Sequence, residues 1–409
     1  MTILNDSVYF FIFRHKCFRW CKYFRLLTAC FLLQGCMSPL ALDHAVMAYD
    51  QTTSDIQSQQ LLLNIARSQQ HQPLHFTGVS NIAATFNFQF NAGATPALTG
   101  NTGMLMTPIF GGTISENPTI SIVPIEGEEF TRRLLTPFQE NKLTMLLRQG
   151  ADIDLVLRLI AGELRIKSHK QDIVYTNCPK DVEGYRNFRQ LVTQMSTIQD
   201  RHNLFVEPLQ FEQSWQVAID HINPEQWIEL QKDFKVDYDQ SHKKLTLTKR
   251  VTGHIVLTNY DPQTLSNEDR VKLNEEADKG SINDIMVDVR QPYLGGEVPI
   301  HGFFRLRSFY NVLNFIGRDI DDEPEFAVDK LPATPNVSEN PIHSLGILVS
   351  EHEPKNTPYF VKYDEKFYTL QPDTGYHWNR EGFRLLHQIF QMTMAELSQR
   401  STPSITISK

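Results

Sequence analysis

Alternating apolar and polar residues give the clearest structural signal in the chain. The sharpest alternation is Ala-Thr-Phe-Asn-Phe-Gln-Phe-Asn at 84–91, which predicts a strand over 82–92. This pattern places Phe86, Phe88 and Phe90 on one face, where they could pack on the core, form an assembly interface or touch lipid. A shorter alternation predicts a second strand over 118–124. The residues between, 93–117, hold five of the 20 glycines and are expected to form a long functional or disordered loop.

Apolar residues at helical spacing predict several helices. Residues 41–70 lack Gly and Pro, and Pro73 is expected to follow the end of a helix there. Residues 127–163 are expected to be helical with an interruption at Pro137, and Asp152 offers an N-cap for the apolar run that follows it. Further helices are expected at 181–200, at 308–316 with Gly317 as a stop, and at 379–399.

Short apolar runs between these helices predict further strands. They mix with the helices without strict β–α–β alternation, so the expected fold class is α+β, with mixed antiparallel strands and packed amphipathic helices. The polar stretch 267–279 is expected to be a solvated helix or loop. The expected strands lie at 204–206, 234–238, 244–249, 254–257, 286–289, 299–304, 345–349, 359–363 and 367–370.

The order of these segments suggests two to three subdomains. The stretch 329–343 contains three prolines together with Ser and Asn, and is predicted to be a linker. The expected divisions are a leader over 1–35, an N-terminal part over 36–200, a middle part over 201–328, the linker, and a C-terminal hairpin with a helix over 344–409.

The first 36 residues have the pattern of an export signal. Five basic residues precede a short apolar run at 26–33, which is too short for the roughly 20 residues of a transmembrane helix. The run ends in Leu33-Gln34-Gly35-Cys36, which resembles the lipobox of bacterial lipoproteins. The resemblance implies cleavage before Cys36 and acyl chains, palmitate among them, on that cysteine. Met37 in the next position implies the inner leaflet of the outer membrane, facing the periplasm.

Removing this leader changes the net charge of the chain and the number of its free cysteines. The formal net charge of the whole chain is −8, and the leader holds five of its 39 basic and one of its 47 acidic residues. The remainder therefore carries 34 basic and 46 acidic residues, a net charge of −12, which disfavours nucleic-acid binding. Of the five cysteines only Cys178 would remain unmodified, so an intramolecular disulfide is not expected.

Candidate chemistry is sparse. His71 and His75 have a metal-binding spacing, but Pro73 between them breaks the helix that the spacing requires. The acidic run at 319–325 lacks the glycine spacing of a calcium loop and is expected to be solvated, pairing with Arg305, Arg307 or Arg318. Cys178 could act as a nucleophile with His169. The sequence predicts no catalytic residue, no cofactor and no metal site.

Several stretches resemble a set of uncharacterised bacterial lipoproteins. Among them are Leu-Asn-Ile-Ala-Arg at 63–67, Asn-Pro-Thr-Ile-Ser at 117–121 and Arg-Leu-Arg-Ser-Phe at 305–309. The expected function is a lipid-anchored, non-catalytic structural or accessory subunit of an envelope assembly, with the membrane and other envelope proteins as partners and no nucleic acid. The alternatives are an envelope hydrolase built from dispersed residues, and a pore-forming lipoprotein that inserts its two alternating strands as a hairpin.

Overall fold

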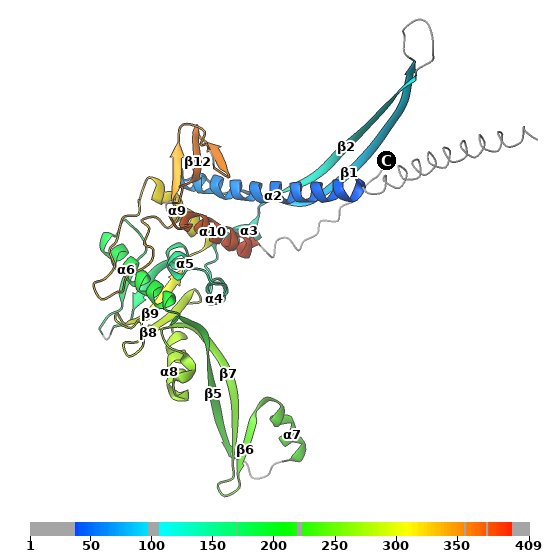
Figure 1. Cartoon of the computed structure of the whole chain (residues 1–409). Coiled ribbons are helices and arrows are strands. Elements are labelled where there is room, and N and C mark those ends of the chain that lie inside the picture. The colour runs from blue at the N-terminus through cyan, green and yellow to red at the C-terminus, as the bar shows by residue number, and fades with distance from the viewer. Residues whose placement is uncertain are drawn as a thin grey trace, which may run out of the picture. The chain divides into compact units, whose positions relative to one another are not determined.

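The computed structural model describes residues 37–96, 106–168, 170–218, 223–355, 357–373 and 375–394. Helices and strands mix along this part of the chain, and the strands form three sheets (Figure 1), which confirms the predicted α+β class. The chain divides into two compact units, Met1–Gln59 and Gln60–Lys409. The features below belong to the second unit, and the finer division predicted from the sequence stays a prediction.

The largest sheet has seven strands in the order β4-β3-β9-β8-β7-β5, with β6 pairing on β7 as well. Only β7 and β8 run parallel to each other, and the other neighbours in this sheet are antiparallel. The strands are β3 (Ala161–Ile166), β4 (Ile173–Thr176), β5 (Phe205–Ala218), β6 (Lys235–Asp239), β7 (Lys244–Thr258), β8 (Asp284–Val289) and β9 (Ile300–Leu306).

Helix α5 (Ile153–Ile160) lies at the centre of the core. All eight of its residues are buried, which is the pattern of a helix surrounded by protein on every side. Asp152 caps it as predicted, because its carboxylate accepts a hydrogen bond from the backbone N–H of Asp154 at 2.8 Å. The other helices are α2 (Met37–Gln69), α3 (Glu128–Leu135), α4 (Glu140–Arg148), α6 (Val182–Asp200), α7 (Pro224–Asp233), α8 (Asn267–Ala277), α9 (Phe309–Ile320) and α10 (Trp378–Met394).

Strands β1 (Phe76–Pro96) and β2 (Met106–Ile125) form a long antiparallel hairpin (Figure 1). The register is regular from Asn81 onward, where Asn81 lies opposite Ser121 and Pro96 lies opposite Met106. The predicted long loop at 93–117 is therefore wrong for 16 of its 25 residues, since 93–96 belong to β1 and 106–117 belong to β2. Glycines and prolines hide this strand in the sequence, and its pairing with β1 fixes it in the structure.

The base of this hairpin is fixed to the core. The Asn64 side chain exchanges two hydrogen bonds with the backbone of His75, both at 2.8 Å. The Gln60 side chain accepts from the backbone N–H of Thr77 at 3.1 Å and donates to the Thr77 hydroxyl at 2.7 Å. Phe76 is 1% exposed, and its ring stacks on Phe390 of α10 at a centroid distance of 4.7 Å. The two amide side chains thus act as a short neighbouring strand for the start of β1.

A second long ribbon is formed by β5 and β7, with β6 and α7 at its far end (Figure 1). The sequence predicts two separate strands at 244–249 and 254–257, but β7 runs without a break through both, because β5 pairs along its whole length. This ribbon carries charged and largely exposed residues such as Glu212, Lys249 and Arg250.

Two helix predictions are corrected by packing. The helix expected over 127–163 is three shorter ones, and Glu163 lies in β3, because β3 pairs with β9. Gly317 does not stop α9, which continues to Ile320. A Cβ at this position would lie 2.8 Å from the backbone nitrogen of Gln69, so glycine allows α9 to pack closely against the end of α2.

The C-terminal part of the described chain adds a small sheet and α10. The sheet has the order β10-β12-β11, from β10 (Ile347–Ser350), β11 (Phe360–Tyr363) and β12 (Lys366–Leu370), so the predicted hairpin at 359–370 is present. The Pro-rich segment 329–343 precedes it. Arg189 of α6 holds this segment by donating to Asn340 Oδ1 at 2.9 Å and to the carbonyl oxygens of Pro341 and Ile342, both at 3.2 Å.

Candidate functional site

The site residues predicted from the sequence lie at the N-terminal end of the chain. Cys36 is outside the described residues, and α2 begins at the next residue, Met37. Phe86, Phe88 and Phe90 occupy alternate positions of β1, opposite Glu116, Ile114 and Gly112 of β2. The three phenylalanine positions therefore share one face of the hairpin backbone, as the alternation predicts.

The structure also brings together a buried group of charged and polar residues that the sequence does not reveal. We call this group the Glu325 cluster. Its members come from α5, α6, α9 and the segment that connects α9 to β10, so residues up to 186 positions apart in the sequence meet around one carboxylate. The members are Arg158, Tyr185, Arg189, Asp319, Glu325, His343 and Ser344.

Glu325 is 5% exposed and accepts several hydrogen bonds. Its Oε1 atom accepts from the Tyr185 hydroxyl at 2.6 Å and from Ser344 Oγ at 2.8 Å, while Oε2 accepts from the backbone N–H of Ser344. Arg158 and Arg189, which are 0% and 1% exposed, lie 3.6 and 3.8 Å from Oε1. Burial alone would raise the pKa of Glu325, but the two guanidinium groups hold it below its usual value.

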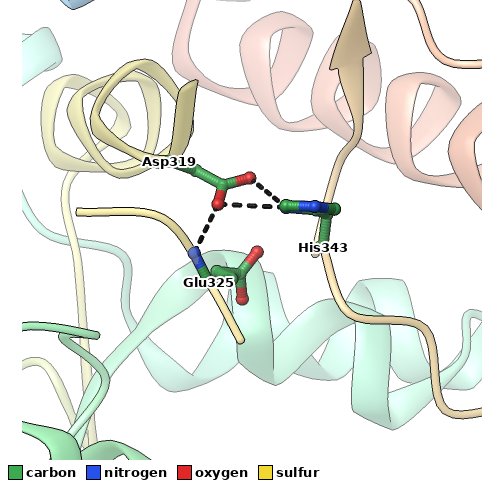
Figure 2. Close-up of side chains that lie close together, drawn as sticks. All are labelled: Asp319, Glu325 and His343. Atoms are coloured by element: carbon green, nitrogen blue, oxygen red, sulfur yellow. Dashed lines mark hydrogen bonds and ion pairs between the residues drawn. The ribbon is translucent and has the colours of Figure 1, made fainter. Parts of the chain in front are cut away.

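Asp319 and His343 extend the cluster toward the surface (Figure 2). Asp319 Oδ1 accepts from the backbone N–H of Glu325 at 2.6 Å, and Asp319 Oδ2 lies 2.8 Å from His343 Nδ1. Burial raises the pKa of Asp319, and the hydrogen bond to Asp319 raises the pKa of His343. The imidazole therefore supplies the cation for a carboxylate that is 8% exposed.

The cluster does not fit a divalent cation, although its Asp, Glu and His ligand atoms lie within 4.8 Å of one another. Two buried arginines already surround the central carboxylate, and its oxygens accept hydrogen bonds from the protein. The guanidinium atoms Arg158 Nη1 and Arg189 Nε are buried donors that lack a hydrogen-bond partner. A divalent cation bound to Glu325 would therefore lie against two guanidinium groups, which repel it. The hydrogen bonds and ion pairs of the cluster link α5 and α6 to residues 321–344.

This arrangement corrects the expectation of a solvated acidic run at 319–325. Asp319 and Glu325 are buried and interact with His343, Arg158 and Arg189 rather than with the three arginines expected. They are buried because α9 ends at Ile320 and the chain turns back over the core. Asp321 and Asp322 are exposed, as expected, and Glu323 lies 3.9 Å from Arg318, one of the expected partners.

A second buried carboxylate, Asp288 of β8, organises another network. It is 3% exposed and accepts from the Tyr260 hydroxyl, from Arg290 Nε at 2.7 Å and from His301 Nδ1 at 2.9 Å. The other imidazole nitrogen lies 3.2 Å from Glu276. Burial alone would raise the pKa of Asp288, but these partners lower it, and the Asp288 hydrogen bond raises the pKa of His301. Both ring nitrogens of His301 thus face carboxylates, which favours the imidazolium form.

The Asp288–His301 pair should make the free energy of unfolding depend on pH. Because the folded pKa of His301 is raised, the pair stabilises fully below the unfolded value of about 6.5, and this contribution is lost as pH rises through the folded pKa. On the acid side the lowered pKa of Asp288 preserves the pair below about pH 4.

We expect His301→Gln to lower the free energy of unfolding by about 0.5–1 kcal/mol near pH 5.5, a value reduced for partial exposure, and by clearly less near pH 9. Urea unfolding at both pH values measures this difference. The matched control is His242→Gln, which removes a similar but mostly exposed pair with Asp239 and should show no measurable pH dependence. A difference for His301→Gln that stays constant between the two pH values would contradict the assignment.

Cys178, the remaining candidate nucleophile, lies beside a polar pocket. Its thiol donates to Glu323 Oε2 at 3.3 Å, and it lines a cavity of about 390 Å³ together with Glu163, Arg305 and Arg307. The Arg307 guanidinium already donates a hydrogen bond to the backbone carbonyl oxygen of Asn177. His169, the possible base, lies outside the described residues. The Cys178–His169 pair therefore stays a prediction.

Comparisons with known proteins add no assignment. No protein-family model, curated protein or solved structure matches this chain. Across the described residues, the helices include none with the length and apolar character needed to cross a membrane. The functional argument consequently rests on the residues and their geometry.

Proposed function

We propose that this protein is a lipid-anchored lipoprotein of the outer membrane that faces the periplasm and serves as a non-catalytic structural or accessory subunit of an envelope assembly. The observation that carries the proposal is the Leu33-Gln34-Gly35-Cys36 sequence, placed directly before the start of α2 at Met37. Two or more acyl chains on Cys36 would give stable membrane attachment.

The buried clusters support the non-catalytic part of this proposal. In the Glu325 cluster and around Asp288, the central carboxylates are buried and their oxygens already accept hydrogen bonds from the protein, while the partly exposed His343, Arg290 and His301 pair with the buried carboxylates. A catalytic group must instead reach a substrate, with a hydrogen-bonding atom left for it. These two networks therefore support a role in stabilising the fold.

The proposed acylation of Cys36 predicts how the Cys36→Ala variant distributes between membrane and soluble fractions. This variant should move most of the protein from the membrane fraction to the soluble fraction of lysed cells, because it removes the acylation site. Cys178→Ala is the matched control and should stay in the membrane fraction. Partition is measured by immunoblotting after ultracentrifugation. Unchanged membrane attachment of Cys36→Ala would contradict the proposal.

The subunit role is tested separately by crosslinking in cells. A photoreactive residue placed in β1 should capture an envelope protein or another copy of the chain, and detergent pull-downs should recover the same species. Recovery of the monomer alone in both experiments would contradict a role in an assembly.

A further inference from the structure

The β1–β2 hairpin has an unusual composition. Between Phe76 and Ile125 the sequence contains a single charged residue, Glu116, whereas the 21% of charged residues in the whole chain would give about ten in a segment of this length. The β5–β7 ribbon is a similar antiparallel pair that carries charges on both strands. A long antiparallel ribbon of this protein can therefore carry charged residues, so the near absence of charge is particular to the β1–β2 hairpin.

The register sorts the hairpin residues into two faces. Residues directly opposite each other share a face, and so do alternate residues along a strand. One face carries Ile82, Ala84, Phe86, Phe88, Phe90 and Ala92 of β1. The positions opposite them are Ile120, Pro118, Glu116, Ile114, Gly112 and Phe110 of β2, so this face is apolar apart from Glu116, the one charged residue of the hairpin. The other face carries uncharged polar residues such as Asn87, Gln89 and Asn91, opposite Ser115, Thr113 and Gly111.

The length of the paired strands matches a lipid bilayer. A strand that crosses the hydrocarbon needs about 9–11 residues at the usual tilt. From Ile82 to Pro96 and from Met106 to Ile120, the strands stay in continuous register, and the apolar face is free of charge over Phe88–Pro96 and Met106–Ile114, nine residues on each strand. The sequence alone predicts a second strand that hardly reaches the required length, whereas β2 has 20 residues.

We propose that β1 and β2 insert into the membrane as a hairpin, with the Phe86–Phe88–Phe90 face against lipid hydrocarbon and the Asn87–Gln89–Asn91 face against water. This proposal deepens the proposed function, because the anchor at Cys36 would keep the hairpin beside the bilayer. In the described part of the chain, no third strand pairs with β1 or β2. Backbone groups at the outer edges cannot remain unpaired in lipid, so the hairpins of further copies pair with these edges.

Lipid explains the pattern better than a protein surface in water. A water-exposed hairpin with open edges is normally protected from aggregation by charges, lysine above all, and β1 and β2 contain no Lys or Arg. A protein-binding face would need apolar residues on that face only, and would leave the opposite face free to be charged. An uncharged polar face behind an apolar face is the pattern of a strand pair between lipid and an aqueous interior.

The test compares neighbouring positions of β1. The full chain is purified with every cysteine except Cys36 replaced by serine, one cysteine is added as Phe88→Cys or Gln89→Cys, and each is labelled with an environment-sensitive fluorophore. The proteins are reconstituted into vesicles of phosphatidylethanolamine and phosphatidylglycerol. We expect nitroxide-labelled lipids to quench the probe at 88, iodide to quench the probe at 89, and chemical crosslinking of the reconstituted protein to give multimers.

A charge at the same positions gives an independent measurement. Phe88→Arg should reduce the vesicle-inserted fraction about tenfold or more, while the matched Gln89→Arg should leave it nearly unchanged. Circular dichroism of both variants checks that the core is folded. Lipid quenching at neither position, equal quenching at both, or monomers alone after crosslinking would overturn the proposal. Labelling of the background without an added cysteine would instead reveal a free Cys36, which contradicts the anchor and not the insertion.

Discussion

Glu325→Gln is expected to lower the free energy of unfolding by about 3–5 kcal/mol, because it removes the carboxylate that Arg158 and Arg189 share and leaves only Asp154, 3.7 Å from Arg158, to balance two buried guanidinium groups. Arg158 and Arg189 have essentially no solvent exposure and both lie within 4 Å of Glu325. The lowered pKa of Glu325 means that its contribution is present above the unfolded value of about 4.3 and is lost only as pH falls through the lower folded value. The loss in Glu325→Gln should therefore be fully present at pH 7.

Urea unfolding followed by tryptophan fluorescence measures this loss. Trp378 reports on the site, because its indole nitrogen donates to the His343 carbonyl at 3.1 Å and Arg158 lies over its ring. The matched control is Glu207→Gln, which removes an exposed pair with Arg148 and should cost less than about 1 kcal/mol. If Glu325→Gln does not fold, the double variant with Arg189→Met should recover stability, since Arg189 pairs with Glu325 and among the described residues then has no carboxylate within 4 Å. A cost for Glu325→Gln equal to that of the control would refute the role of the cluster.

Phe76→Ala is expected to destabilise the protein by about 3–5 kcal/mol, the usual cost of deleting a buried phenylalanine ring. Its ring contacts Phe390, Phe130 and Phe309 at centroid distances of 4.7, 6.2 and 6.3 Å. Since Phe76 is the first residue of β1, the cavity lies where the hairpin joins the core. Backbone amides at the base of β1 should then exchange hydrogen faster, which hydrogen-exchange mass spectrometry measures together with the urea midpoint.

Two variants define the range of this effect. Phe76→Leu keeps most of the volume and should cost less than Phe76→Ala. Phe360→Ala removes a half-buried ring of the small sheet and should leave exchange in β1 unchanged. Exchange that rises equally in Phe360→Ala and Phe76→Ala would show that the hairpin base responds to global stability and is not held by Phe76.

The sequence correctly predicts helices and strands whose pattern lies within their own residues. The cap at Asp152 and the strict alternation at 84–91 correctly place α5 and β1. The sequence finds only the 118–124 end of β2, because Gly111 and Gly112 weaken the pattern of the rest, and only the regular pairing with β1 makes that part a strand. It also mistakes Gly317 for a helix stop, because the reason for this glycine is the backbone of a helix about 250 residues earlier in the chain.

The Glu325 cluster shows the same limit for a site. Arg158 interrupts an otherwise apolar run in α5, and a charged residue inside a fully buried helix was a local signal that a partner is needed. The identity of that partner could not be read from the sequence, because Glu325 and Ser344 lie in loops more than 160 residues away. Composition made the acidic run at 319–325 look solvated, while the turn after α9 buries two of its carboxylates.

The contact between Phe76 and Phe390 has a consequence for the order of folding. The two rings are separated by about 300 residues, so this contact forms only when nearly the whole chain is available, whereas the hydrogen bonds from Asn64 and Gln60 to the hairpin base are local. During synthesis, the hairpin emerges early and its partner in α10 emerges late. The hairpin therefore lacks this core contact for most of synthesis, and a chaperone would protect it during that time.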